Sequence, residues 1–138
     1  MKKALIDSNV ILCYLTKDPP KMAEATLRTL DDAQKGKISL LLTPLTVAEV
    51  VWVLESFYGQ TKARISEIMG QFLFCEGLEV EDLDLIIEAL TLYEAKNLDF
   101  ADAFLAATAL RRGPRGIYSF DHDFNRVPGI TRLEPGKD

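Results

Sequence analysis

Residues 38–54 read ISLLLTPLTVAEVVWVL, and this stretch decides the fold class. Its first five residues form an almost continuous apolar run, as expected of a strand that is buried on both faces in a parallel sheet. Thr43 and Pro44 then supply an N-cap and a first-turn proline, which predicts a helix over residues 44–57. A buried strand that passes directly into a helix is typical of an α/β protein.

The same alternation continues in both directions along the chain. Toward the N-terminus we expect a strand over 3–6 and a helix over 8–15, followed by a helix that Asp18 caps and Gly36 ends. The remaining helices are expected after Thr61, over 82–96 and from Asp99 to Gly113, and the remaining strands over 78–80, 116–119 and 130–133. No two strands are joined by a hairpin turn, so the pattern predicts a three-layer α/β/α fold with a central parallel sheet. No linker or repeat interrupts it, and residues 1–138 are expected to form a single domain.

The composition is that of an ordinary globular protein with an excess of acids. The 138 residues include 16 basic and 21 acidic side chains, for a net charge of −5. A negative chain is a poor ligand for nucleic acid, but one divalent cation would bring −5 to −3 and two would bring it to −1. Cys13 and Cys75 lie in apolar surroundings without a metal-site spacing, which predicts reduced, buried thiols. No apolar run could span a bilayer and no signal-peptide pattern is present, so we expect a cytoplasmic protein.

Glu49 is the one charged residue in the middle of an apolar helical segment. It lies in a helical row with Leu45 and Trp52, and the opposite row is apolar as well. A helix that is apolar nearly all round is buried or lies in a subunit interface. An ionised carboxylate there needs a partner, because its desolvation alone is costly. The structural alternative is a capping box formed by Thr46 and Glu49, with the helix starting later.

Asp102 raises the same question within residues 100–107, FADAFLAA. Aspartate is a poor residue for a helix interior, and Asp99 would lie on the same face. The structural alternative makes Asp99 the N-cap and Asp102 an acid of the first turn, both favoured by the helix dipole. We interpret Asp99 as the cap and assign a functional role to Asp102.

Two further acids follow expected strands. Asp7 comes directly after the strand over 3–6 and Asp121 after the strand over 116–119, although either could be a simple cap or turn residue. Ligands of open parallel sheets bind beyond the carboxyl ends of the strands. We therefore expect Asp7, Asp121, Glu49 and Asp102 to face one crevice. Gathered carboxylates repel one another unless a cation neutralises them, and an all-oxygen set suits Mg²⁺ or Mn²⁺.

These acids lie in short motifs that, in this order and spacing, resemble those of PIN domains. The motifs are Asp7-Ser8-Asn9, Glu49 in a helix, Asp99-Phe100-Ala101-Asp102-Ala103 and Ser119-Phe120-Asp121-His122-Asp123-Phe124. Within that family the chain is most similar to the VapC-type toxins of prokaryotic toxin–antitoxin modules, over essentially its whole length. The resemblance implies a parallel sheet flanked by helices, RNA cleavage that depends on Mg²⁺ or Mn²⁺, a homodimer, and a cognate antitoxin as partner.

Carried over by position, the resemblance assigns the site residues. Asp7, Glu49, Asp102 and Asp121 are the acidic quartet, and our own hypothesis is that Asp7 and Asp102 ligate the metal, directly or through waters. Supporting positions are matched by Ser8, Asn9, Asp99, Ser119 and Asp123. Asp123 stays open as an alternative to Asp121 for the fourth acid.

The function expected from the residues and the resemblance is that of an endoribonuclease, the toxin of a type II toxin–antitoxin system, which cleaves RNA with a metal-activated water. An acid of the quartet, for example Glu49, would take the proton of that water. Arg112 and Arg115 are candidates for contacts with substrate phosphates, and the alternative is a solvated helix end favoured by its dipole. Two other interpretations stay open: an inactive PIN-like scaffold used for binding, and a PIN nuclease that acts in RNA processing.

Overall fold

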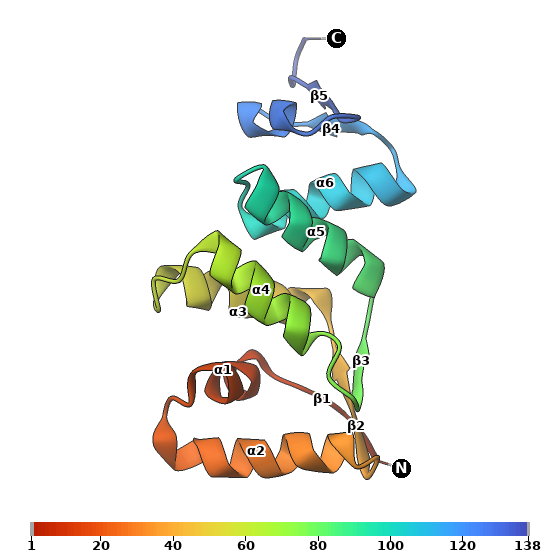
Figure 1. Ribbon diagram of the computed structural model, residues 1–138. Helices are drawn as coiled ribbons and strands as arrows, with labels where there is room; N and C mark the ends of the chain where they lie inside the picture. Colours follow the sequence, from red (N-terminus) through yellow and green to blue (C-terminus); the bar gives the residue numbers. More distant parts are fainter. Residues whose placement is uncertain (1, 138) are drawn as a thin grey trace. The chain divides into compact units, whose positions relative to one another are not determined.

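The computed structural model of the protein describes residues 2–137. By its internal contacts the chain divides into two compact units, Met1–Leu83 and Asp84–Asp138. Each unit has its own helices and its own parallel strand pairing (Figure 1).

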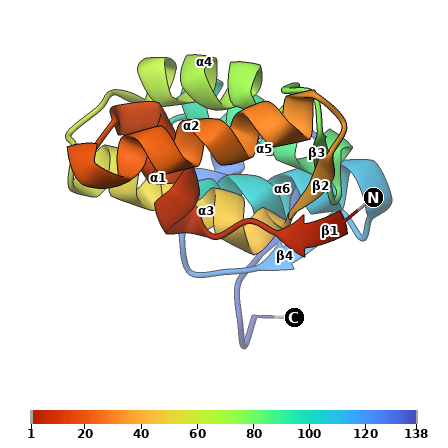
Figure 2. The same ribbon diagram turned by 90° about the horizontal axis from the view of Figure 1, so that it is seen from below.

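The N-terminal unit is built on a three-stranded parallel sheet in the order β1-β2-β3. Its strands are β1 (Lys2–Leu5), β2 (Ile38–Leu42) and β3 (Leu78–Val80), and its helices are α1 (Ser8–Thr16), α2 (Pro20–Gln34), α3 (Pro44–Ser56) and α4 (Lys62–Phe72). Leu5 lies opposite Leu41 in the register, and Figure 2 shows β1 and β2 side by side. Because the strands are parallel and in register, α1 and α3 both begin at the carboxyl edge of the sheet.

Threonine caps define the starts of two helices, and the sequence predicts the one at Thr43. The Thr43 hydroxyl accepts a hydrogen bond from the amide of Thr46, and Pro44 is the first residue of α3. Thr61 caps α4 in the same way. The prediction that Asp18 caps the next helix is wrong, because the N-cap of α2 is Pro19 and the Asp18 carboxylate instead accepts the Tyr58 hydroxyl at 2.8 Å.

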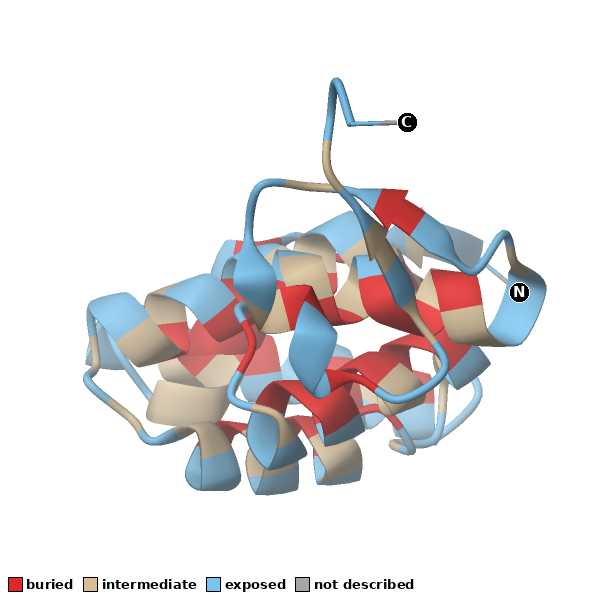
Figure 3. Ribbon diagram, turned by 90° about the horizontal axis from the view of Figure 1, so that it is seen from above, coloured by how far each residue is buried: buried red, intermediate tan, exposed pale blue. Residues whose placement is uncertain are grey.

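The two faces of α3 differ in a way that the sequence pattern does not reveal. Val47, Val50, Val51 and Leu54 are fully buried and belong to the core. The row that carries Glu49 is exposed, with Leu45 at 72% and Trp52 at 68%. Figure 3 shows that residues of all burial classes alternate along the helices of the chain. The buried environment expected for Glu49 is therefore wrong, whereas an exposed apolar row is what a subunit interface would require.

One glycine in this unit is required by its surroundings. Gly77, just before β3, has φ +85°, and a Cβ there would lie 2.2 Å from the carbonyl oxygen of Ala33 in α2. Its own carbonyl accepts the amide of Leu40 at 2.8 Å. Only glycine combines this left-handed conformation with so close an approach of two backbones.

The C-terminal unit contains two helices and a pair of short parallel strands. Its elements are α5 (Leu83–Ala95), α6 (Phe100–Arg112), β4 (Gly116–Tyr118), the 3₁₀ helix η1 (His122–Arg126) and β5 (Thr131–Leu133). Ile117 in β4 lies opposite Arg132 in β5. Tyr93 of α5 packs edge-on against Phe100 of α6, with ring centroids 6.2 Å apart.

The expectation of buried thiols agrees with the structure at Cys13 but not fully at Cys75. Cys13 is buried and Cys75 half-buried, and both are free thiols. Burial raises the pKa of the Cys75 thiol. Across residues 2–137 there is no helix with the length and apolar character needed to cross a membrane.

Candidate active site

Asp7 stands at the carboxyl end of β1, at the N-cap position of α1. Its backbone is extended, with φ −86° and ψ 154°, but its side chain makes no capping hydrogen bond. The carboxylate is exposed and has no hydrogen-bond or ion-pair partner among the residues that the structure describes. The simple capping role considered for Asp7 therefore leaves the side chain unexplained, and both oxygens can accept a ligand.

Ser8 connects this position to Glu49. The Ser8 hydroxyl is 7% exposed and donates a hydrogen bond to Oε2 of Glu49, 3.1 Å away. The alternative capping box is excluded, because α3 starts at Pro44 and Thr46 donates to Thr43 rather than pairing with Glu49. The structure thus holds Glu49 through the neighbour of Asp7, and Asn9 is exposed one residue further along α1.

A second set of acids lies in the C-terminal unit. Asp99 is at the N-cap position of α6 as predicted, but its side chain makes no capping bond. Asp102 follows in the first turn and is half-buried. Burial raises the pKa of the Asp102 carboxyl, and the negative charges of Asp121, Asp99 and Asp123 raise it further. Each of these three acids is therefore close enough to Asp102 to disfavour its negative charge.

Asp121 and Asp123 differ in how their charges are compensated. Oδ1 of Asp121 accepts the amide of Asp123 at 2.9 Å and so caps η1, while no basic side chain within residues 2–137 pairs with Asp121. Asp123 forms an ion pair with Arg126 at 2.9 Å. This difference favours Asp121 over Asp123 as the fourth acid, because a carboxylate without a cationic partner is the better candidate for a metal site.

The arginines proposed to bind phosphate already have partners in the chain. Arg112 pairs with Asp84 at 3.5 Å. Arg115 donates to the carbonyl oxygens of Leu110 at 3.1 Å and Gly129 at 3.3 Å. Both bonds of Arg115 tie the end of α6 to the following loops, which is the structural alternative foreseen for a helix end.

Sequence reasoning gave no role to Arg132, in the weakest of the expected strands. Its Nη1 donates to the carbonyl oxygen of Ser119 at 2.8 Å, and its side chain is only 14% exposed. The only signal in the sequence is a charged residue at an inward position of a short strand.

The acids are thus divided between the units, with Asp7 and Glu49 in one and Asp99, Asp102, Asp121 and Asp123 in the other. Among the described residues of either unit taken by itself, no group of three or more His, Cys, Asp or Glu side chains is arranged to hold a metal ion. What each unit offers is carboxylate oxygens without cationic partners, which are ligands for a hard divalent cation or acceptors for a proton.

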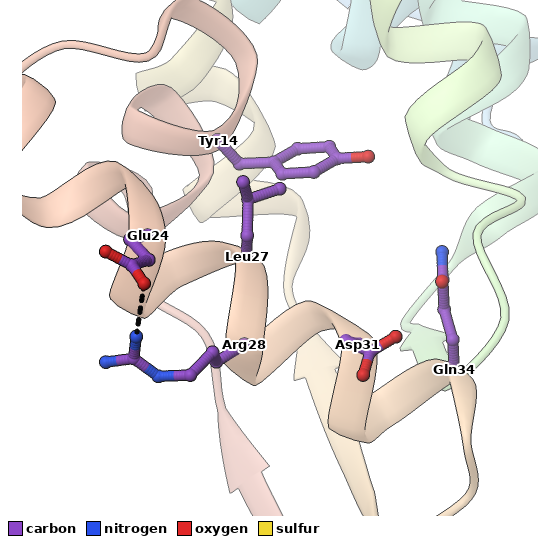
Figure 4. A pocket seen from close by; sticks show the side chains of 6 residues that line it. All are labelled: Tyr14, Glu24, Leu27, Arg28, Asp31 and Gln34. Carbon is purple, nitrogen blue, oxygen red and sulfur yellow. Dashed lines mark ion pairs between the residues drawn. The ribbon is translucent and has the colours of Figure 1, made fainter.

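A separate groove lies on α2 and α1 in the N-terminal unit. Tyr14, Leu27 and Gln34 line a depression of about 410 Å³, at whose edge Arg28 pairs with Glu24 at 3.4 Å (Figure 4). A second depression of about 470 Å³ shares Tyr14 and Leu27 and continues onto Ile68 and Phe72 of α4 and onto Cys75, which follows α4. Together they form a groove of mixed character, in which these apolar side chains alternate with charged and polar ones.

Comparison with known proteins places these features in a family. A family model described as the PIN domain matches residues 4–130, which extend over both units. The chain is also 27% identical over 131 residues to a VapC ribonuclease of Aquifex aeolicus (strain VF5), covering 95% of this chain and 96% of that protein. The family match and the parallel pairing in both units confirm the predicted α/β/α fold class. Since the match covers nearly the whole chain, the protein belongs to the PIN-domain family.

Proposed function

We propose that the protein is an endoribonuclease that requires Mg²⁺ or Mn²⁺ and acts as the toxin of a type II toxin–antitoxin system. Membership of the PIN-domain family and the similarity to a VapC ribonuclease support a nuclease. The observation that carries the metal-dependent reaction is the state of Asp102, a half-buried carboxylate beside three other acids and without a basic partner among the described residues.

The charge on Asp102 needs a counterion. Burial and the neighbouring acids both disfavour its ionised form. If the role of Asp102 were structural, a basic side chain or capping amides would be expected to stabilise it. A divalent cation would supply that stabilisation, and an all-carboxylate set selects a hard ion over zinc.

We assign the metal ligands to Asp7 and Asp102. Asp7 fits because its carboxylate is exposed and unpaired among the described residues, and Asp102 because its pKa is raised. A bound Mg²⁺ or Mn²⁺ would lower the pKa of a coordinated water and offset the charge that develops on the scissile phosphate.

The other acids and their partners orient water and substrate. Ser8 occupies Oε2 of Glu49, so the remaining oxygen can accept the proton of the attacking water. Asp121 keeps one oxygen without a partner after capping η1 and completes the acidic set. Asp99 and Asp123 add negative charge around Asp102 and serve as supporting residues.

The proposed partners match two apolar surfaces of the N-terminal unit. The groove over Tyr14 and Leu27 is proposed to receive a segment of a cognate antitoxin, which would contact these apolar side chains and the charged Glu24 and Arg28 beside them. The exposed Leu45 and Trp52 of α3 suit a homodimer contact. RNA and antitoxin would both be met in the cytoplasm.

A cleavage assay tests the catalytic proposal. Single-stranded RNA is incubated with the protein and Mg²⁺ or Mn²⁺, with and without EDTA, alongside Asp7→Asn and Asp102→Asn. Loss of a carboxylate ligand should lower the cleavage rate by at least about 100-fold. Glu67→Gln and Glu94→Gln change exposed acids outside the proposed site and should cleave at the wild-type rate.

A measurement of metal binding distinguishes a catalytic protein from an inactive scaffold. Isothermal titration with Mn²⁺ should show binding that Asp7→Asn and Asp102→Asn both abolish. Equal cleavage in the presence of EDTA and in all variants would refute the mechanism, and absence of Mn²⁺ binding would support an inactive PIN-like scaffold.

A further inference from the structure

We propose that Arg132 of β5 is a positioning residue, which holds the loop that carries Asp121 in the geometry required for catalysis. This inference rests on the proposed function for the role of Asp121. The contacts of the loop itself are independent of that function.

Ser119 is the centre of the contacts that shape the loop. Its amide donates to the carbonyl of Leu133 at 2.9 Å, and its carbonyl accepts Nη1 of Arg132 at 2.8 Å. Its hydroxyl accepts the amide of Asp121 at 2.9 Å, and Oδ1 of Asp121 accepts the amide of Asp123 at 2.9 Å. The amide, the carbonyl oxygen and the hydroxyl oxygen of Ser119 are therefore all hydrogen-bonded, and Arg132 provides the side-chain donor that reaches Ser119 from β5.

The environment of Arg132 is costly for a cation. The side chain is 14% exposed, and its Nε is buried without a hydrogen-bond partner in residues 2–137. Its carboxylate neighbour, Glu134, is 3.9 Å away and also pairs with Lys137 at 2.9 Å. An apolar residue of similar size would fill the position without this desolvation cost. Packing alone therefore does not account for an arginine here, whereas its short bond to Ser119 does.

The direction of the Asp121 carboxylate depends on this arrangement. One carboxylate oxygen of Asp121 accepts a hydrogen bond from the Asp123 amide, so the conformation of the loop determines the direction of the other oxygen. Without Arg132 the carbonyl of Ser119 loses its donor, and the peptide leading to Asp121 can rotate. Loss of a residue that orients the groups around a metal site typically lowers metal affinity or activity by about 10- to 100-fold.

Two substitutions test the inference. Arg132→Met removes the donor and keeps the packing volume, and Glu134→Gln is the matched control, because it changes the carboxylate beside Arg132 but not the bond to Ser119. Amide hydrogen exchange of Asp121 and Asp123, followed by NMR, reports on the loop directly. Mn²⁺ titration and RNA cleavage report on its function.

We expect Arg132→Met to speed the exchange of both amides, to weaken Mn²⁺ binding about 10-fold and to lower kcat about 10- to 100-fold with little change in KM. Glu134→Gln should match the wild type in all of these. Arg132→Lys keeps a charged donor and should recover part of the loss, and it replaces Arg132→Met if that variant does not fold.

The outcomes distinguish this inference from the proposed function. Amide exchange at the wild-type rate in the Arg132 variants overturns the positioning role. If the wild type is active, Mn²⁺ affinity and kcat in the Arg132 variants equal to those of the wild type overturn it as well. A wild type that neither binds Mn²⁺ nor cleaves RNA defeats the proposed function, and the exchange measurement still decides whether Arg132 orders the loop.

Discussion

The hydroxyl of Ser8 donates a hydrogen bond to Oε2 of Glu49, 3.1 Å away and 41 residues later in the chain. The bond joins the first residue of α1 to the middle of α3, and Ser8 is almost completely buried while Glu49 is exposed. The contact therefore limits the rotamers of a carboxylate that would otherwise move freely in solvent.

Ser8→Ala removes this bond without adding bulk. We expect a loss of about 0.5–1.5 kcal/mol in the free energy of unfolding, the usual net value of one hydrogen bond. We also expect a decrease of about 10-fold in kcat, because Glu49 is no longer held. Chemical denaturation and RNA cleavage measure the two effects. Ser56→Ala, which removes only a local bond to the Trp52 carbonyl in α3, should leave kcat unchanged, and an equal loss of kcat in both variants would contradict the role of Ser8.

At Asp102 we expect one substitution to change stability and activity in opposite directions. Its folded-state pKa is raised, chiefly by burial and then by Asp121, so the ionised carboxylate destabilises the metal-free protein at neutral pH. Asp102→Asn should therefore raise Tm by about 1–3 °C at pH 7, an effect of about 0.5 kcal/mol given solvent screening.

The pH dependence follows from the sign of that shift. The gain in Tm should shrink as the pH falls through the raised pKa and vanish below about pH 3, where the carboxyl is protonated in both the folded and the unfolded state. Mn²⁺ affinity of the wild type should also fall as the pH falls through the raised pKa, because the ion must displace the proton. Scanning calorimetry and Mn²⁺ titration between about pH 3 and about pH 8 test both trends, and a Tm gain that persists below about pH 3 would exclude this origin.

Gly77 should be intolerant of any side chain. Gly77→Ala places a Cβ against the Ala33 carbonyl and forces alanine into φ +85°. We expect a loss of about 2–5 kcal/mol in the free energy of unfolding, from backbone strain and overpacking together. Gly70→Ala in α4 meets nothing within 4 Å and should be stabilising by about 0.5–1 kcal/mol. Urea denaturation of the pair is the measurement, and similar stabilities would contradict the close approach of the backbones.

Trp52 provides a test of the proposed homodimer. Trp52→Glu places a charge in the exposed apolar row of α3 and should shift the protein from dimer to monomer in light scattering after gel filtration. Its Tm as a monomer should change little, since the side chain is exposed. Phe74→Glu alters an equally exposed aromatic residue elsewhere in the unit and should stay dimeric. A wild type that is already monomeric would remove this part of the proposal.

Leu27 tests the proposed antitoxin groove. Leu27→Glu should weaken binding of a cognate antitoxin by at least about 10-fold, because it buries an unpaired charge against an apolar partner. Met22→Glu lies on the same helix outside the groove and serves as the control in the same titration. Equal affinity of both variants would show that the partner binds elsewhere.

Much of the secondary structure is predictable from local patterns. The strand limits at residues 38–42 and 78–80 agree with the structure, and the cap at Thr43 is confirmed, because apolar runs and capping residues act over a few positions. The environment of Glu49 is not predictable in this way. Periodicity shows that both rows of α3 are apolar, but which row is buried depends on distant elements.

In the candidate site, too, local features are predictable from the sequence, whereas the environments of the side chains are not. The acids stand out because each interrupts an apolar run or follows a strand, and their raised or unpaired state is visible only in three dimensions. Arg132 could not have been found, since its bond to Ser119 joins two strands whose pairing the sequence does not specify. The role of Asp121 as the cap of η1 depends likewise on a short 3₁₀ helix that has no apolar period.

The pairing of Leu5 with Leu41 limits where residues can be inserted into the chain. Asp7 and Thr43 each come two residues after this pair, so an extra residue between Leu5 and Asp7 would turn the following side chains to the opposite face of the strand. By contrast, Gly36 lies in an exposed turn with open space around its Cα. A reporter peptide inserted at residues 35–37 should therefore be accommodated, while a single added alanine after Leu5 should abolish cleavage.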